Sequence, residues 1–375
     1  MERNNSIAHG PGLASIVLAL GLAACGPARP PADFAPAPEL LSRIQEIRVY
    51  PVSEAACPGQ VIRTSYTALL DNGTEVPFST TYDKDRPPPL HVVMLRRTSP
   101  DAYPRENGDW DTAADPLQSV LHGFRLSAFL RQKPSLNTFA TIAPFYDCLR
   151  HAFSFRGRHG GQGAAGETGP DITVRVGILS SPFYDRLLVA GIEVGPAPPQ
   201  YVFSDPDLIP PADWLIVASR GGNGGAGVPG SDGAPGTDGE AGCPGSAGGQ
   251  GGAGGNGGPG GPGGRGSRIT VIAPEDEPFL AGLVDVRSVP GEGGEGGEGG
   301  AGGPGGTGGE AQGGSERRCR AGADGADGQP GANGPDGPDG GYGPRAETVL
   351  LPLAQVFGPR APFPIAELLA RSSGG

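Results

Sequence analysis

The sequence predicts a mainly β protein with a low-complexity glycine-rich region: an N-terminal β sandwich, then a bundle of extended glycine-rich rods with short β-strands at its base. Three observations support this class. Glycine makes up 69 of the 375 residues and proline 42, well above average usage. From residue 221 to residue 266, every third residue is glycine. Short alternating or β-branched runs lie before and between the glycine tracts, as expected of strands.

The first residues have the features of a secretory signal. Arg3 supplies a positive charge, and the apolar run from Leu13 to Leu22 is too short to cross a bilayer, which takes about 20 apolar residues. Leu22-Ala23-Ala24-Cys25 resembles the lipobox of bacterial lipoproteins. The resemblance implies that residues 1–24 are removed and that Cys25 is lipidated. The alternative is an ordinary signal peptide with an incidental cysteine.

Lipidation of Cys25 implies a membrane anchor. The resemblance implies several acyl chains on this cysteine, and stable anchoring needs more than one chain. Gly26 stands where enterobacterial lipoproteins retained at the inner membrane carry Asp. We therefore expect an outer-membrane lipoprotein of the cell envelope that faces the surface or the periplasm. The Pro/Ala-rich residues 25–39 are expected to form an extended, semi-rigid tether.

Residues 40–156 are predicted to form a small β domain. Asp71-Asn72-Gly73 is a strong turn signal between strand-like runs. Residues 117–130 fit either a helix or two strands. The strand-like runs are residues 47–50, 61–66 and 90–95, the last of which is apolar enough for a buried strand.

One motif in this domain resembles a known family. Tyr146-Asp147-Cys148 resembles the Tyr-x-Cys of immunoglobulin-like sandwiches, in which the tyrosine lies two residues before the second cysteine. The gap from Cys57 is long for that family, and no Trp lies where the family places it. An immunoglobulin-like sandwich and an unspecified β sandwich therefore both remain open.

The cysteines predict two disulfides. Besides Cys25 there are four, an even number in an exported chain, and four cysteines allow three connectivities. Pairing by region joins Cys57 to Cys148 and Cys243 to Cys319. The spacing Cys148-x-x-His151 also suits a metal, but no second matching pair lies nearby. We therefore expect disulfides and no metal here.

Residues 157–345 form the glycine-rich repeat region with interspersed strands. Glycine at every third position matches the three-residue turn of the polyproline-II-type helix and leaves a bare edge that another backbone can approach. The signature resembles two families: the collagen triple helix, and the polyglycine-II bundle of springtail antifreeze protein and some phage tail adhesins. Disorder is the third interpretation of such a composition.

The residues between the glycines favour the bundle. Collagen stability depends on proline at both free positions, whereas the tract from 221 to 266 has proline only in the third position of the triplet. From Gly249 to Gly264 the second position is also glycine. A second bare edge costs conformational entropy, and neighbours on two sides of the rod would explain it.

The tract lengths fit a fold-back near Cys243. Folding there gives four rods of about 70–75 Å at a rise of about 3.1 Å per residue. They are residues 221–243, 245–268, 291–314 and 322–345. Cys243 and Cys319 then lie together at the far end. Four apolar runs lie at the near end, namely Trp214–Val217, Ile269–Ile272, Leu283–Val286 and Thr348–Leu351. Residues 346–375 are expected to form a C-terminal strand and tail.

The sequence contains no enzyme motif. Gly-x-Gly-x-x-Gly occurs throughout the repeats and therefore carries no information as a nucleotide signature. The chain has no phosphate-loop lysine, His-Glu-x-x-His or Gly-x-Ser-x-Gly. We expect no catalysis and no cofactor, with a small enzyme or ligand-binding domain at 40–156 as an alternative. The net charge of −12 argues against nucleic acid as a partner.

The expected function is that of a cell-surface lipoprotein with a structural or adhesive role, and a collagen-like trimeric stalk is the alternative. By resemblance to the phage adhesins, binding of a surface protein or glycan would occur at the bundle tip. The candidate tip residues are Arg317, Arg318 and Arg320. An acidic row on the last rod is either a solvated face or a calcium site, since calcium prefers oxygen ligands. Its members are Asp324, Asp327, Asp336 and Asp339.

Overall fold

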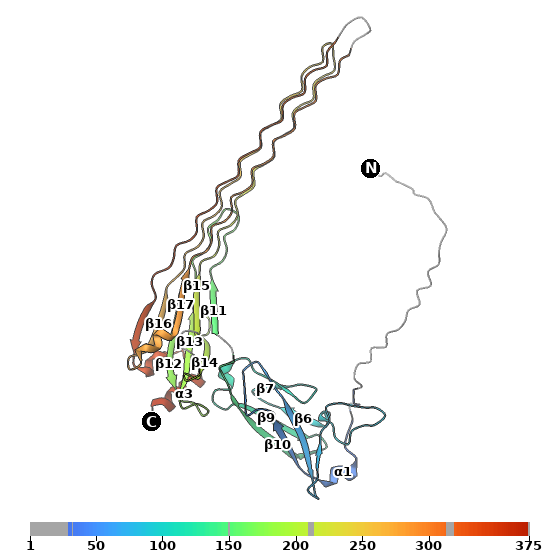
Figure 1. Ribbon diagram of the computed structural model, residues 1–375, viewed down its shortest axis with the longest axis vertical. Coiled ribbons are helices and arrows are strands. Elements are labelled where there is room, and N and C mark those ends of the chain that lie inside the picture. The colour runs from blue at the N-terminus through green and yellow to red at the C-terminus, as the bar shows by residue number, and fades with distance from the viewer. Residues whose placement is uncertain (1–28, 32, 149–150, 209–213, 313–318, 374–375) are drawn as a thin grey trace, which may run out of the picture.

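The computed structural model describes residues 29–31, 33–148, 151–208, 214–312 and 319–373. It is mainly β, as the sequence predicts. Figure 1 shows an N-terminal β part, a second β part, and long extended segments that leave the second part together. The signal-peptide residues 1–24, Cys25, Arg317 and Arg318 lie outside the described residues.

The N-terminal part contains three small sheets. Their strand orders are β1-β4-β5, β2-β10-β9-β6 and β3-β8-β7. Helix α1 (Pro38–Arg43) precedes β1, and the 3-10 turns η1 (Val92–Met94) and η2 (Pro116–Gln118) precede β6 and β9. The strands are β1 (Ile44–Pro51), β2 (Ala55–Ala56), β3 (Val61–Ile62), β4 (Thr64–Leu70), β5 (Glu75–Pro77), β6 (Leu95–Thr98), β7 (Ala102–Pro104), β8 (Trp110–Thr112), β9 (Phe124–Leu130) and β10 (Lys133–Pro144).

Side-chain alternation builds the core of this part. Burial alternates along β4 and along β9, because successive side chains of a strand point to opposite faces. Tyr66, Ala68 and Leu70 of β4 lie in one apolar cluster with Ala128 and Leu130 of β9. The β1-β4-β5 sheet and the sheet that contains β9 therefore share a core.

Two segments of this part differ from the structure that their sequence predicts. Residues 90–95 are not one buried strand: the Nδ1 atom of His91 accepts the N–H of Val93 at 3.1 Å, which caps η1, and β6 begins only after that turn. Residues 117–130 contain the end of η2 and the single strand β9. The turn predicted at Asp71-Asn72-Gly73 is confirmed, since it connects β4 to β5.

The second part contains two sheets, ordered β11-β15-β17 and β14-β13-β12-β16-β18. Within the first sheet all strands are parallel, and β12, β16 and β18 are parallel within the second. The strands are β11 (His151–Arg156), β12 (Ile172–Leu179), β13 (Leu187–Val194), β14 (Gln200–Ser204), β15 (Leu215–Arg220), β16 (Ile269–Pro274), β17 (Val284–Val289) and β18 (Glu347–Leu351). The 3-10 turn η4 (Pro278–Leu283) lies between β16 and β17.

The domain boundaries expected from the sequence shift accordingly. Strand β11, assigned above to the domain at 40–156, pairs along its length with β15 of the second part. The four apolar runs predicted at the base of the rods are strands β15 to β18. The β12-β13-β14 meander was not anticipated within the glycine-rich region. After β18 the chain forms α2 (Leu353–Val356) and α3 (Phe363–Ser373) where a tail was expected, and Ile365 and Leu368 bury one face of α3.

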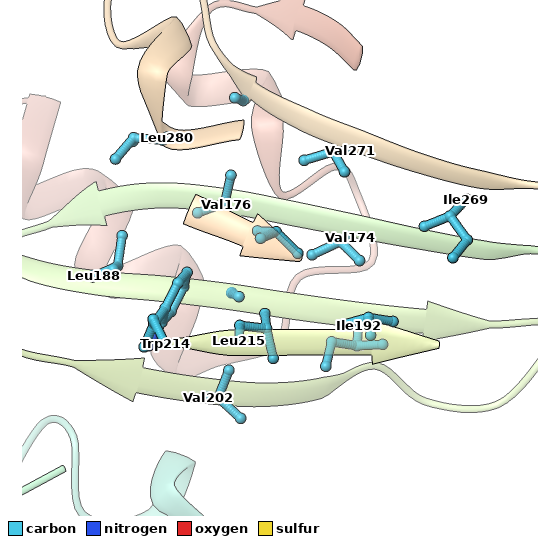
Figure 2. Packing of buried hydrophobic residues seen from close by; sticks show 14 of the residues in the cluster. Val174, Val176, Leu188, Ile192, Val202, Trp214, Leu215, Ile269, Val271 and Leu280 are labelled. Atoms are coloured by element: carbon cyan, nitrogen blue, oxygen red, sulfur yellow. The ribbon is translucent and has the colours of Figure 1, made fainter. Parts of the chain in front are cut away.

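The core of the second part lies between its two sheets (Figure 2). Val174 and Val176 of β12, Leu215 of β15 and Val271 of β16 belong to one buried cluster with Trp214, and all five are labelled in Figure 2. Burial of apolar side chains stabilises a fold by about 1.5–3 kcal/mol for each large residue. This core therefore holds the strands at the base of the glycine tracts in fixed positions.

A second apolar cluster connects the two parts. Val120 and Tyr146 of the N-terminal part pack with Phe203 of β14, Val356 of α2 and Leu368 of α3. The Tyr146 ring centroid lies 5.0 Å from that of Phe203, and its hydroxyl lies 3.3 Å from Ser119 Oγ. Tyr146 thus packs between the two parts, and among the described residues its hydroxyl is hydrogen-bonded to Ser119 Oγ, whereas the tyrosine of an immunoglobulin corner bonds to backbone.

Candidate functional site

Four glycine segments extend from the second β part (Figure 1). We call residues 221–242, 245–266, 291–312 and 322–343 the first, second, third and fourth glycine segments. The first and third continue strands β15 and β17, and the second and fourth lead back into β16 and β18. The chain thus runs out and back twice, and the four segments lie side by side along one axis.

Glycine N–H groups join these segments at every third residue. The N–H of Gly230 donates to the carbonyl of Glu298 at 2.7 Å. The N–H of Gly255 donates to the carbonyl of Ser231 in the first segment at 2.7 Å, and the N–H of Gly300 donates to the carbonyl of Gly255 at 2.8 Å. Bonds of this kind connect the first segment with the second and third, the second with the third and fourth, and the third with the fourth. The second and third segments therefore each have three neighbours among the four, and the first and fourth have two.

The number of neighbours explains the number of glycines. A Cβ on Gly300 would overlap the carbonyl of Ser231, and a Cβ on Gly302 would overlap that of Gly328. The third segment therefore needs glycine at two positions of each triplet from residue 291 to residue 308. The first segment, which has only two such neighbours, has Val228, Ser231 and other exposed side chains in its second positions. A Cβ on Gly255 would lie 3.0 Å from the Ser231 hydroxyl oxygen, so these side chains lie beside the second-position glycines of the second segment.

A short hairpin at residues 157–169 covers the base of the first segment. Gly225 donates to the carbonyl of Ala164 at 2.9 Å, and Gly163 donates to Ala226 at 2.7 Å. Where the hairpin ends, the second position of the first segment changes from glycine to Val228. The local composition thus follows the presence of a covering backbone.

The aspartates of the fourth segment accept backbone hydrogen bonds from the third. Asp324, Asp327, Asp336 and Asp339 accept the N–H groups of Gly308, Gly305, Gly296 and Gly293 at 2.7–2.9 Å. Asn333 does the same for Gly299. The row is thus an exposed acidic face in which one oxygen of each carboxylate is bonded to the neighbouring backbone. Within the residues that the structure describes, no group of His, Cys, Asp or Glu forms a metal site.

The far end of the segments is closed by a disulfide. Cys243 and Cys319 are bonded, with their Cα atoms 4.9 Å apart, which confirms the pairing expected from the fold-back. The carbonyl of Arg320 accepts the N–H of Gly245 at 3.0 Å, and the Arg320 side chain is exposed beside the disulfide. Arg320 therefore lies at the tip, as expected, and its two companions Arg317 and Arg318 are outside the described residues.

The second disulfide joins Cys57 to Cys148, with Cα atoms 6.3 Å apart. This bond rules out the metal interpretation of Cys148-x-x-His151, because the Cys148 sulfur is already bonded. Burial lowers the pKa of His151 below its usual value, so this imidazole is neutral at physiological pH.

An arginine-lined groove of about 640 Å³ lies in the N-terminal part. It is bordered by strand β6, by β7 and the turn after it, and by residues 80–82. We call this site the arginine groove. Five arginines line it, and Glu106 is the one acidic residue among the lining residues. They are Arg29, Arg96, Arg97, Arg105 and Arg131.

The arginine groove also contains neutral groups. Tyr82 and His91 line it, with their ring centroids 6.4 Å apart, and the lining residues also include Thr80 and Thr81, which carry hydroxyl groups. Burial lowers the pKa of His91, so this imidazole adds no positive charge at neutral pH. The positive charge of the groove therefore comes from guanidinium groups, which suit carboxylate or phosphate ligands.

No family model, curated protein or solved structure matches this chain. Among the described residues, no helix has the length and apolar character needed to cross a membrane. The glycine segments present backbone and acidic side chains, and the arginine groove presents cations. The arginine groove could not be predicted from the sequence because its arginines come from separate elements, although adjacent Arg96 and Arg97 beside a buried run were a signal.

Proposed function

We propose that this chain is an outer-membrane lipoprotein with a structural and binding role, in which the glycine segments form a polyglycine-II-type rod that holds a binding tip away from the β parts. The single observation that supports this proposal best is the hydrogen bonding between glycine segments of one chain at every third residue. At a rise of about 3.1 Å per residue, each segment spans about 70 Å.

The same hydrogen bonds favour an intrachain bundle over the collagen-like stalk. Collagen requires three chains wound in parallel, whereas the second segment bonds to antiparallel neighbours within its own chain. Fold-back of one chain supplies every neighbour that the central glycines require. The proposed state is therefore a monomer with a rod about half as long as a continuous 221–266 tract would need.

The proposed function has two attachment points, the tip of the rod and the lipid anchor. Arg320, together with Arg317 and Arg318 close to it in sequence, would bind an anionic surface protein or glycan. Cys25 would attach the chain to the membrane. The proposed role requires neither catalysis nor a cofactor. A ligand-binding role for the N-terminal part is a second candidate, because it contains the arginine groove.

Two measurements test this proposal. Light scattering and small-angle scattering of residues 26–375 should give one chain per particle and a rod of about 70 Å. Three chains per particle with a profile twice as long would support the collagen-like stalk instead. Labelling with a fatty acid should mark the wild-type chain and not Cys25→Ser, and equal labelling of both would contradict the anchor.

A further inference from the structure

The arginine groove carries positive charge that the proposed function does not use, and one of its lining residues, Arg29, lies close to Cys25 in the sequence. We propose that it binds the phosphate headgroups of the membrane lipid in which the chain is anchored. The membrane as the source of phosphate rests on the proposed lipidation of Cys25. The preference of the groove for an anion rests on its own residues.

Two of the five guanidiniums have acidic partners. Arg105 pairs with Asp111 at 2.7 Å, and Arg29 pairs with Glu106 at 3.3 Å on the exposed surface. The first of these pairs raises the pKa of Arg105 and lowers that of Asp111. Their charges are thus largely compensated.

The other three guanidiniums are not compensated. Arg97 donates to the backbone carbonyls of Asp109, at 3.3 Å, and Arg105, which are neutral acceptors. Arg96 lies 5.9 Å from the ring centroid of Phe129. In the part of the chain that the structure describes, Arg96, Arg97 and Arg131 form no ion pair with a carboxylate. Three arginines without a carboxylate partner among the described residues therefore line one groove, with Arg96 and Arg97 leaving opposite faces of β6. The net charge of the whole protein is −12.

The chemistry and size of the groove suit a phosphate diester. The guanidinium fork binds two oxygens of a phosphate group, and such charge-assisted hydrogen bonds are stronger than neutral ones. A volume of about 640 Å³ falls within the usual range of small-ligand sites. Thr80, Thr81 and Tyr82 also line the groove, and their hydroxyl groups are suited to the glycerol or alcohol part of a headgroup.

The position of the groove in the chain selects the source of the phosphate. Arg29 and Pro30 line the groove, and Arg29 is only four residues after Cys25. An extended chain covers at most about 14 Å over four residues. The headgroup layer of a bilayer is about 5–8 Å thick on each side. A lipidated Cys25 would therefore keep Arg29, at the edge of the arginine groove, within about 14 Å of the lipid-bearing residue and so close to the headgroup layer.

Vesicle sedimentation with residues 26–375 tests the groove without the lipid anchor. This chain keeps every residue that the structure describes. The probes are vesicles of phosphatidylcholine alone and vesicles in which about one third of the lipid is phosphatidylglycerol. The test variant is Arg96→Gln with Arg131→Gln, which leaves the hydrogen-bonded Arg97 in place. The control is Arg268→Gln with Arg345→Gln, which removes the same charge at the base of the glycine segments.

We expect binding to the phosphatidylglycerol vesicles and not to phosphatidylcholine alone. Each arginine near an anionic surface contributes roughly five-fold to affinity, so the test variant should bind roughly 30-fold more weakly, and binding should weaken with salt. The control variant should bind within about two-fold of wild type. Equal binding to both vesicle types, or equal loss in test and control variants, would overturn the proposal, provided that both variants melt as wild type does.

Two further outcomes distinguish lipid phosphate from free phosphate, and the headgroup proposal from the proposed lipid anchor. If inorganic phosphate, equimolar with the lipid phosphate, displaces the chain completely, the groove is a site for the free anion and the membrane source is wrong. If phosphate does not compete, the headgroup assignment stands. Failure of fatty-acid labelling at Cys25 would overturn the proposed anchor, whereas the vesicle result with residues 26–375 would be unaffected by it.

Discussion

Replacing Gly300 by alanine is the most direct test of close approach between the glycine segments. Gly300 lies in the third segment and is buried. Its N–H donates to Gly255 at 2.8 Å, and its carbonyl accepts from Gly331 at 2.8 Å. A Cβ there would overlap the carbonyl of Ser231 in the first segment. Backbone cannot move aside as a flexible side chain can, so the first and third segments must separate.

The expected loss of stability follows from the bonds on either side. The nearest bonds between these two segments are Gly230 to Glu298 at 2.7 Å and Gly233 to Ala301 at 2.8 Å. Asp232 also accepts the N–H of Ala301 at 2.8 Å. Each hydrogen bond contributes about 1 kcal/mol net, so loss of these three destabilises the region by about 3 kcal/mol.

Gly341→Ala is the matched control. A Cβ on Gly341 would meet only side-chain atoms of Arg265, at 3.5 Å and beyond, which is ordinary contact distance. Gly341 is not among the glycines with positive φ. Alanine there should leave stability unchanged or raise it by about 0.4–1 kcal/mol through the unfolded state.

Hydrogen exchange of glycine amides in protein labelled with ¹⁵N-glycine measures the difference. A loss of about 3 kcal/mol corresponds to roughly 100-fold lower protection of the amides in the first and third segments. The control should keep wild-type protection. Equal protection in Gly300→Ala and Gly341→Ala would refute the reasoning, because close backbone contact at Gly300 would then be absent.

Three other perturbations address the bonds that close the bundle. Asp336→Ala should cost about 1–2 kcal/mol in denaturant unfolding by removing a side-chain acceptor, and Asp336→Asn, which keeps the acceptor oxygen, should cost much less. Cys243→Ser or Cys319→Ser opens a loop with a sequence separation of 76 and should lower stability by about 4 kcal/mol, measured by calorimetry; an unchanged melting temperature would contradict this. Hydrogen bonds from Thr307 lower the pKa of Asp238, so the contribution of Asp238 to stability should be present above pH 3.8 and lost as the pH falls through the lowered pKa. Asp238→Ala should remove that part of the acid transition, and a profile of stability against pH identical to that of the wild type would contradict this.

The period-three glycines predicted extended segments, and the lengths of the tracts predicted their fold-back. Cys243 and Cys319 lie at positions that become neighbours once the tract from 221 to 266 is folded at its middle, and the disulfide is present. The apolar runs beside the tracts predicted β15 to β18 because β-branched residues bounded by glycine are typical of strands.

Other features depended on distant partners and could not be read from local sequence. Asp336 looked like a solvated charge because its acceptor role depends on the register between the third and fourth segments, 40 residues apart in sequence. Residues 90–95 looked like a strand because their apolar pattern was visible, whereas the His91 cap on Val93 was not. The β12-β13-β14 meander was obscured by the glycine composition around it. The arginine groove is formed by residues from separate strands and turns.

The continuation of parallel strands into hydrogen-bonded glycine segments restricts how this molecule can change in length. A triplet inserted into the second segment alone, before Asn256, would shift the rest of that segment by one triplet relative to its hydrogen-bond partners. Asn256 would then move away from the N–H of Ala332, whose hydrogen bond it accepts. One triplet inserted at the same level in each of the four segments would preserve every bond below and above it. Such a matched insertion lengthens the rod by about 9 Å. Natural or engineered length variants should therefore differ by whole sets of four triplets, with the strands at the base and the disulfide at the tip unchanged.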